Sequence, residues 1–531
     1  MTSDNTPSPA DIAARRPFST GRPRNLPQAA IRFRADARWS TAMGQKTFFL
    51  LLLLGPWGAG GTPAGAEQPK APARPLNVVF LLADDLRWDA LGCAGNRVVR
   101  TPNIDRLAGR GVLFRNAFVT TSICAASRAS LLCGQYARRH GINDFDTPFG
   151  ATAWAQTYPA LLRRAGYRTG FVGKFGVGKD VRPLAAAFDY WRGLPGQAGP
   201  FLDPKDPTRP HATARFGDQA LEFLAGCRPG KPFCLSVSFS APHARDGDPR
   251  EFAPDRRDEK LYADAAIPVP KTAHERYFRL LPRFVQQSEG RRRWQRRFAT
   301  PEMFQRTARD YYRLVTGIDR EVGRIAAALR ARKLADDTLV VFTSDNGFFL
   351  GERGLADKWL MYEASIRVPL VVFDPRLPER SRGREVGGMA LNIDLAPTLL
   401  DYFGVPIPPD MQGKPLAGTV AVDTPIHDAV LFGQHGQHVN VTDGRYVYMR
   451  APARPDNAPL YEYTLMPTHM RHIFDVGELQ DIRLQEPFRF TKGCRTMKVA
   501  SVPRSTRIPS APCSSTCKTT RSRSIHCGIK R

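Results

Sequence analysis

The sequence predicts an α/β fold: a large mixed, mostly parallel sheet sandwiched by helices, followed by a small C-terminal subdomain with an antiparallel sheet and a helix. Two continuous apolar runs, 77–83 and 338–343, have strand length and are typical of central strands that are covered on both faces. A long helical pattern over about 302–333 precedes the second run. From about residue 425 the pattern changes to short strands, at 429–432, 438–441 and 446–449.

The length of the chain predicts more than one structural unit. A chain of 531 residues is too long for one ordinary hydrophobic core. We expect a main domain over 76–420 and a C-terminal subdomain over 421–495. The Pro-rich stretch 406–415 lies just before this boundary.

The N-terminal region is typical of a targeting segment. Lys46 precedes the apolar run 47–54, and Ala64-Gly65-Ala66 follows as a cleavage site. We therefore interpret 43–66 as a signal peptide that starts at Met43, 1–42 as an upstream N-terminal extension, and 67–75 as a linker. This interpretation predicts a periplasmic or secreted protein. It predicts no stable membrane span, because the apolar run is too short to cross a bilayer.

Positive charge is concentrated at the two ends of the chain. The net charge is +27, and residues 489–531 contain no acidic residue. The excess of positive charge in the middle of the chain suits an anionic substrate but is weak evidence for nucleic-acid binding, so we expect no nucleic-acid partner. We interpret the atypical basic tail 496–531 as the product of a shifted reading frame; a genuine disordered tail is the alternative.

The stretch Cys124-Ala-Ala-Ser-Arg128 is the first candidate for chemistry. It lies at the predicted start of a helix, where free backbone N–H groups and the helix dipole favour anions and thiolates. Arg128, four residues later, lies on the same helix face. The pattern indicates a site for an anionic group. A buried structural cysteine is the alternative.

Oxygen-bearing side chains follow both central strands. Asp84-Asp85 comes directly after the first strand, and Ser344-Asp345-Asn346-Gly347 ends the second. Parallel strands bring their carboxyl ends to one edge of the sheet, and oxygen ligands suit Ca²⁺ or Mg²⁺. The alternative is a pair of capping residues in a loop.

Six motifs follow one another along the chain: Asp84-Asp85, Cys124-x-Ala-Ser-Arg128, Gly173-Lys174, Pro242-His243, Ser344-Asp345-Asn346-Gly347 and Lys358-Trp-Leu-Met-Tyr-Glu363. In this order they resemble the motifs of type I sulfatases, which belong to the alkaline-phosphatase-like superfamily. The similarity covers about 76–495, so that 76–420 is identified as the catalytic domain.

The resemblance implies a sulfatase that hydrolyses a sulfate ester, with a sulfated small molecule or polysaccharide as substrate. It implies that Cys124 is oxidised to formylglycine, whose hydrate is the nucleophile, and that Arg128 holds this group. It implies a bound Ca²⁺, or Mg²⁺, held by Asp84, Asp85, Asp345, Asn346 and the residue at Cys124. Lys174 and Lys358 correspond to lysines that bind sulfate oxygens. His243 corresponds to a histidine near the leaving oxygen and is our choice for the general acid.

Three positions depart from the family pattern. Ala126 stands where proline is commoner, which implies maturation by the anaerobic type of sulfatase-maturing enzyme. Gly176 stands where many relatives have a histidine, and His140, His211 or a water are the alternatives for its substitute. Arg353 stands where relatives often have another histidine, and an arginine cannot transfer a proton at neutral pH.

Two function classes remain as alternatives: a phosphate or phosphonate ester hydrolase on the same fold, and a non-catalytic protein that binds anionic glycans. Two smaller questions also stay open. The basic run Arg291–Arg297 is either a solvated helix face or a contact for a polysulfated substrate. Cys227 and Cys234 are candidates for a disulfide.

Overall fold

The structure is a computed structural model, and it describes residues 77–434 except Gln197, together with 439–450, 460–465, 474, 476–488, 491, 493–501, 517–520 and 524–527. The proposed extension, signal peptide and linker lie outside the described residues, as does most of the basic tail. In the described ranges, no helix has both the length and the apolar character needed to cross a membrane.

An eight-stranded sheet forms the centre of the fold, with strand order β10-β2-β9-β6-β1-β5-β3-β4. Only β9 runs antiparallel to its neighbours in this sheet, so the predicted mixed, mostly parallel sheet is confirmed. The strands are β1 (Asn77–Ala83), β2 (Val112–Phe118), β3 (Arg168–Lys174), β4 (Tyr190–Leu194), β5 (Phe233–Ser238), β6 (Thr338–Ser344), β9 (Arg367–Phe373) and β10 (Arg384–Leu391).

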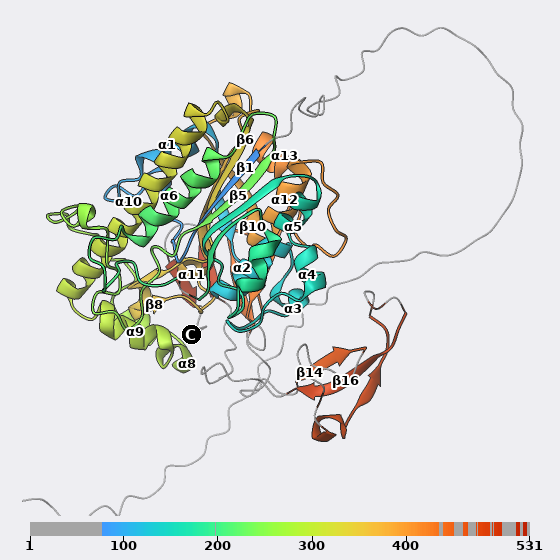
Figure 1. The fold of residues 1–531 in the computed structure, drawn as a ribbon. Helices are drawn as coiled ribbons and strands as arrows, with labels where there is room; N and C mark the ends of the chain where they lie inside the picture. The colour runs from blue at the N-terminus through green and yellow to red at the C-terminus, as the bar shows by residue number, and fades with distance from the viewer. Residues whose placement is uncertain are drawn as a thin grey trace, which may run out of the picture. The chain divides into compact units, whose positions relative to one another are not determined.

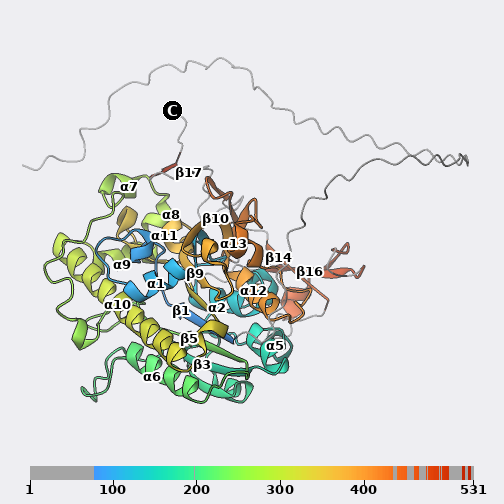
Figure 2. The same cartoon turned by 90° about the horizontal axis from the view of Figure 1, so that it is seen from above.

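Helices cover both faces of the sheet (Figure 1). Alternate residues of β1 enter two separate hydrophobic clusters, because successive strand side chains point to opposite faces. One face packs against α1 (Pro102–Arg110), α6 (Ala212–Ala225) and α10 (Pro301–Ala331). The other packs against α2 (Cys124–Cys133), α5 (Tyr158–Arg164) and α12 (Leu395–Tyr402), as Figure 2 also shows. Helix α10 confirms the long helical pattern.

Shorter elements lie in the loops that connect these layers. The remaining helices are α3 (Ala137–His140), α4 (Ala151–Ala155), α7 (Glu275–Arg279), α8 (Arg283–Gln286), α9 (Glu289–Arg297), α11 (Glu363–Ile366) and α13 (Ala417–Val422). The strands β7 (Phe349–Leu350) and β8 (Ala356–Asp357) form a two-stranded pair.

The C-terminal region contains antiparallel sheets, as predicted. One consists of β11 (Val430–Gly433), β12 (Val439–Thr442) and β13 (Val447–Arg450). A second consists of β14 (Leu460–Thr464), β15 (Arg483–Gln485) and β16 (Thr496–Ser501), accompanied by the 3-10 helix η8 (Val476–Leu479). The strands β17 (Cys517–Thr520) and β18 (Ser524–Cys527) pair with each other.

The expected bridge between Cys227 and Cys234 is wrong. Both thiols are free. Cys227 packs in the cluster on the α6 side of the sheet, whereas Cys234 belongs to the cluster on the α5 side. The sheet itself separates the two sulfur atoms, so their closeness in the sequence does not bring them together.

Candidate active site

The carboxyl ends of β1 and β6 bring the predicted oxygen ligands together. The two strands pair in parallel, with Ala83 opposite Ser344, so the residues that follow them are neighbours. The Asp85 N–H donates to Asp345 Oδ1 at 3.2 Å, and Asn346 Nδ2 donates to Asp85 Oδ1 at 2.5 Å. All four predicted oxygen ligands, Asp84, Asp85, Asp345 and Asn346, are fully buried.

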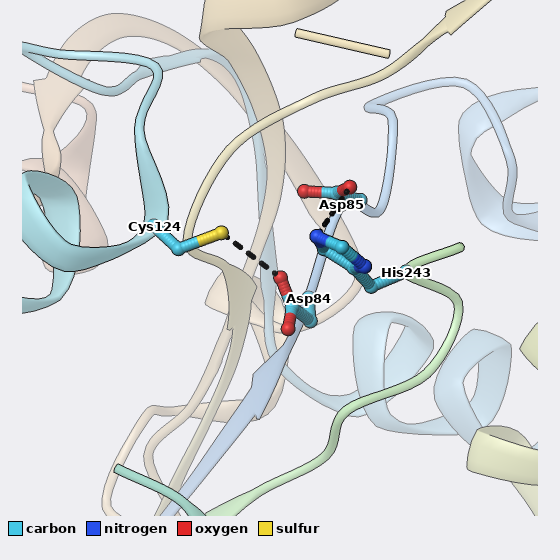
Figure 3. Close-up of side chains that lie close together, drawn as sticks. All are labelled: Asp84, Asp85, Cys124 and His243. Carbon is cyan, nitrogen blue, oxygen red and sulfur yellow. Dashed lines mark hydrogen bonds and ion pairs between the residues drawn. The ribbon is translucent and has the colours of Figure 1, made fainter. Parts of the chain in front are cut away.

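Cys124 is the first residue of α2 and faces this carboxylate group (Figure 3). Its Sγ lies 3.5 Å from Asp84 Oδ1 and 2.9 Å from Lys358 Nζ. Burial raises the pKa of the Cys124 thiol, and the charge of Asp84 adds to this effect although two lysines oppose it. The thiol is therefore protonated at neutral pH and is a poor nucleophile as it stands.

Arg128 connects the helix to four strand ends. Its Nε donates to Asp345 Oδ2 at 2.7 Å, and its Nη2 lies 3.5 Å from Asp84 Oδ2. Its Nη1 donates to the Lys174 carbonyl at 2.7 Å and to Ser238 Oγ at 2.6 Å. The predicted placement of Arg128 on the same helix face as Cys124 is thus confirmed, and its guanidinium is almost completely buried.

Two lysines complete the charged set. Lys174, at the end of β3, pairs with Asp84 Oδ2, and Lys358, just after β8, pairs with Asp85 Oδ1. Burial alone would raise the pKa of Asp84, but Lys174 and the other nearby cations hold it well below its usual value. Three buried carboxylates therefore face three buried cations, which satisfies the requirement that buried charges be paired.

His243 lies in the loop after β5 and is buried. Its Nε2 is 3.6 Å from Asp85 Oδ2 (Figure 3), and its Nδ1 is 2.5 Å from the Ala244 carbonyl. Because that carbonyl can only accept, Nδ1 carries a proton and Nε2 is the atom that the ring presents to the carboxylates. Burial lowers the pKa of His243 well below its usual value, so the ring is neutral.

The donor set fits a hard divalent cation. Asp85 Oδ2 and Asn346 Oδ1 are buried and have no hydrogen-bond partner, which is costly for a polar atom unless a ligand satisfies it. Candidate ligand atoms of Asp84, Asp85, Cys124 and His243 all lie within 4.8 Å of one another. Burial and the neighbouring carboxylates raise the pKa of Asp85 even though Lys358 lies beside it. A cation between these oxygens would remove both costs.

Glycine at position 176 fits the course of the Arg128 side chain. A β-carbon added at Gly176 would lie 2.8 Å from Cδ of Arg128, and the residue has a φ of 73°, which favours glycine. The course of the Arg128 side chain therefore leaves no room for a larger residue here.

Neither histidine considered as a substitute is placed to act on Cys124. His140 Nε2 contacts Ser130 Oγ at 3.0 Å, and its Nδ1 accepts from the Ile142 N–H. His211 caps α6 through Nδ1, while Nε2 contacts the Ala253 carbonyl. Both nitrogens of each ring are thus engaged with local groups.

Arg353 is buried and adopts a left-handed backbone conformation. Its N–H donates to the Thr272 carbonyl, and its guanidinium carbon lies 5.9 Å from the centre of the Tyr362 ring.

Three residues that contribute to the site were not found from the sequence. Ser238 anchors Arg128, and the Tyr311 hydroxyl on α10 donates to the Asp85 carbonyl at 2.7 Å. Asp357 is fully buried directly before Lys358 and pairs with two arginines of α9. Asp357 adjoins a recognised motif, which is a usable signal; nothing in the sequence marks Tyr311.

The comparisons with known proteins agree with the geometry. The family model described as Sulfatase matches residues 76–405, and the model described as N-sulphoglucosamine sulphohydrolase, C-terminal, matches residues 351–490. An N-acetylglucosamine-6-O-sulfatase of Bacteroides thetaiotaomicron is 29% identical over 427 residues, which cover 68% of this chain and 74% of that protein. The human N-sulphoglucosamine sulphohydrolase is 32% identical over 346 residues, which cover 63% and 62%.

Solved structures agree on the fold. A structure of BT4656 in complex with its substrate D-glucosamine-2-N,6-O-disulfate has a TM-score of 0.60 and 26% identity, and the match covers 72% of this chain and 89% of that one. A phosphonate monoester hydrolase of Agrobacterium radiobacter also has a TM-score of 0.60, but at 22% identity it shows only the shared fold. Because the family model covers more than half of the chain, this protein belongs to the sulfatase family of the alkaline-phosphatase-like superfamily.

Proposed function

We propose that this protein hydrolyses sulfate esters of sulfated carbohydrates, with the residue at position 124 as the nucleophile. The observation that carries the proposal is the placement of Cys124: it lies at a helix N-terminus, between Asp84 and Lys358. Arg128 and Lys174 add two further buried positive charges to the same pocket. Fixed positive charge of this kind stabilises the charge that develops on sulfate oxygens during transfer.

The state of the thiol supports conversion of Cys124 to formylglycine. Its raised pKa makes the unmodified side chain a poor nucleophile. The hydrated aldehyde supplies a hydroxyl for attack on sulfur and a second hydroxyl for release of the sulfate. The substitution of Ala126 for the commoner proline is the reason to propose the anaerobic maturing enzyme. Secretion through the segment that starts at Met43 is part of the same proposal.

Each charged residue then has a stated task. Asp84, Asp85, Asp345 and Asn346, with the residue at 124, would hold Ca²⁺, which would supply Lewis-acid polarisation of the sulfate. Lys174 and Lys358 orient the sulfate oxygens, and Arg128 fixes the nucleophile. The charged side chains of the set balance one another, so a divalent cation gives the pocket the positive charge that an anionic ester needs.

His243 is our candidate for protonating the leaving oxygen. The hydroxyl of the nucleophile forms a bond to sulfur as the ester sulfur–oxygen bond breaks, and the departing alcohol oxygen takes a proton from Nε2 after the ring has been protonated there. The ring is neutral in the structure, and an anionic ester beside it raises its affinity for the required proton. The test of this role is the dependence of rate on the leaving group.

The experiment begins with mass spectrometry of the Cys124 peptide, from protein co-expressed with the anaerobic maturing enzyme. Rates are then measured on sulfate esters of amino sugars, including 6-O-sulfated and N-sulfated glucosamine, and on matched phosphate esters. The Cys124→Ala variant is the control. We expect formylglycine and faster turnover of sulfate esters. Faster turnover of phosphate esters favours the alternative hydrolase, and an unconverted thiol in the native host favours a non-catalytic binding protein.

A further inference from the structure

The basic run of α9 has two faces: Arg292 and Arg296 are exposed to solvent, whereas Arg293 and Arg297 point inward. Arg297 is only 2% exposed, which makes it one of the largest buried side chains of the described chain. Arg293 and Arg297 are four residues apart and lie on the same face of the helix. The interpretation as a solvated face therefore holds for Arg292 and Arg296, while Arg293 and Arg297 form a paired, largely internal arrangement.

The two arginines bind acidic residues from two different loops. Arg297 donates through Nε to Glu251 Oε2 at 2.5 Å and through Nη2 to Asp246 Oδ1 at 2.9 Å, and its Nη1 contacts Asp357 Oδ2. Arg293 Nη1 donates to the same Asp246 oxygen at 2.6 Å and to Asp357 Oδ2 at 2.8 Å. Both side chains thus span the same pair of loops.

These two loops carry His243, the proposed proton donor to the leaving oxygen, and Lys358, the proposed ligand of the sulfate oxygens. Asp246 and Glu251 lie three and eight residues after His243, in the loop that follows β5. Asp357 directly precedes Lys358, and α9 lies beside β8, which ends at Asp357 (Figure 1). Asp357 has a φ of 67°, and Trp359, two residues later, has a φ of 71°. Two unfavourable backbone conformations in so short a segment need external contacts to hold them.

Further contacts reinforce the Lys358 side of this arrangement. The guanidinium carbon of Arg293 lies 4.8 Å from the centre of the Trp359 ring. Trp359 in turn packs on the small cluster of Ile123, Ala126 and Ala137 next to the nucleophile. Asp357 is fully buried, so it depends on the two arginines for charge balance.

We propose that Arg293 and Arg297 are positioning residues that hold the His243 loop and the Lys358 loop in one relative geometry. The two arginines, together with Asp246, Glu251 and Asp357, are called the clasp below. The inference rests on the proposed function for the roles of His243 and Lys358. The clasp sets the separation between the proton donor and the sulfate-binding lysine. The helix α9 thereby tunes the reaction through the two loops, because catalytic groups displaced by about 1 Å lose on the order of 100-fold in rate.

The test uses Asp246→Asn, which removes the carboxylate that both arginines share on the His243 side. Arg297 keeps Glu251, but both arginines lose an anchor, so their hold on Asp357 is expected to loosen as well. Asp246 is half-exposed, so the variant is expected to fold. Asp246→Glu restores the charge as the conservative rescue. Arg292→Gln is the matched control, because Arg292 lies on the same helix, is exposed, and in the described part of the chain pairs with Glu289 of α9 rather than with either loop.

Two readouts are taken. In the first, kcat and KM are measured with an activated aryl sulfate and with an alkyl sugar sulfate. We expect Asp246→Asn to lower kcat about 10- to 100-fold for the sugar sulfate. The loss for the aryl ester, which needs little proton donation, should be several-fold smaller. Asp246→Glu should recover part of the rate, and Arg292→Gln should match the wild type.

The second readout is amide hydrogen exchange over 244–251 and 356–362, which does not depend on activity. The clasp predicts faster exchange in both segments for Asp246→Asn and in neither for Arg292→Gln. Unchanged exchange in 356–362, or an equal loss of kcat for both esters, overturns the proposal. A wild-type protein that hydrolyses neither ester contradicts the proposed function, and the exchange measurement then still decides on the clasp.

Discussion

The Tyr311 hydroxyl is expected to hold the metal-binding turn in place. It donates to the Asp85 carbonyl at 2.7 Å and accepts from the Arg87 N–H at 3.1 Å. Asp85 has a φ of 63°, a left-handed conformation that costs a non-glycine residue about 1–3 kcal/mol. The bridge between Asp85 and Arg87 spans this turn and offsets that cost.

The substitution Tyr311→Phe removes only the hydroxyl. The ring of Tyr311 stacks on Phe348 and meets Phe252 edge-on, and phenylalanine keeps both contacts. Two buried backbone groups lose their partner, and each costs about 1–3 kcal/mol. We therefore expect the free energy of unfolding to fall by about 2–5 kcal/mol, allowing for partial relaxation of the turn.

The assay is urea unfolding, performed with added Ca²⁺ and with a chelator. In the variant the Ca²⁺ concentration required for half-maximal stabilisation should rise, because Asp85 is less well placed. Tyr312→Phe is the control: its hydroxyl contacts the Asn96 side chain, away from Asp85, and its loss should cost about 1 kcal/mol. The reasoning is refuted if Tyr311→Phe stays within about 0.5 kcal/mol of the wild type and shows the same Ca²⁺ dependence.

Three further predictions concern the site and the pH dependence of stability. Gly176→His should lower kcat by about 10-fold or more, because the new β-carbon would lie 2.8 Å from Arg128 Cδ. Gly95→His is the control: Gly95 also has a positive φ, but a β-carbon there would meet no atom within 4 Å, so kcat should be unchanged. Restored or increased activity in Gly176→His would contradict this. Ca²⁺ at 100 times its Kd should stabilise the wild type by about 2.7 kcal/mol in thermal or urea unfolding and Asp345→Asn by less; equal stabilisation would argue against a cation at these oxygens. Burial lowers the pKa of His211 to about 4, so between about pH 6.5 and 4 the unfolded chain binds a proton that the folded chain does not. The free energy of unfolding of the wild type should therefore fall by about 3 kcal/mol over this range. His211→Asn should flatten that part of the stability profile, and an unchanged profile would show that the ring is not buried in its neutral form.

The sequence was sufficient wherever a strand end decides the position of a side chain. Asp84 and Asp345 follow apolar runs that can only be neighbouring central strands, so their meeting is a consequence of parallel pairing. Cys124 and Arg128 are related by helical periodicity alone. These parts of the site follow from local pattern and sheet geometry.

The rest of the site depends on contacts between loops, and no periodic pattern in the sequence shows which loops meet. Nothing local shows that Lys358 reaches Asp85, or that Arg297 reaches Asp357 and Glu251. The error with Cys227 and Cys234 has the same origin, because short separation along the chain said nothing about which face of the sheet each residue occupies. The inward face of the basic run of α9 was missed, since charge density alone does not reveal that its partners come from two distant loops.

The departure at Gly176 bears on whether this chain is an enzyme at all. A missing histidine at a motif position is the usual reason to infer a family member that has lost its activity. In this structure, the space beside position 176 is taken by Arg128, which extends to the Lys174 carbonyl and Ser238. Arg128 also pairs with Asp345 in the same conformation. Glycine at 176 thus fits the observed course of Arg128, and the charge arrangement around Cys124 is intact although the histidine is missing. The intact charge arrangement therefore favours an enzyme over the non-catalytic alternative, which the departures at Gly176 and Arg353 motivated.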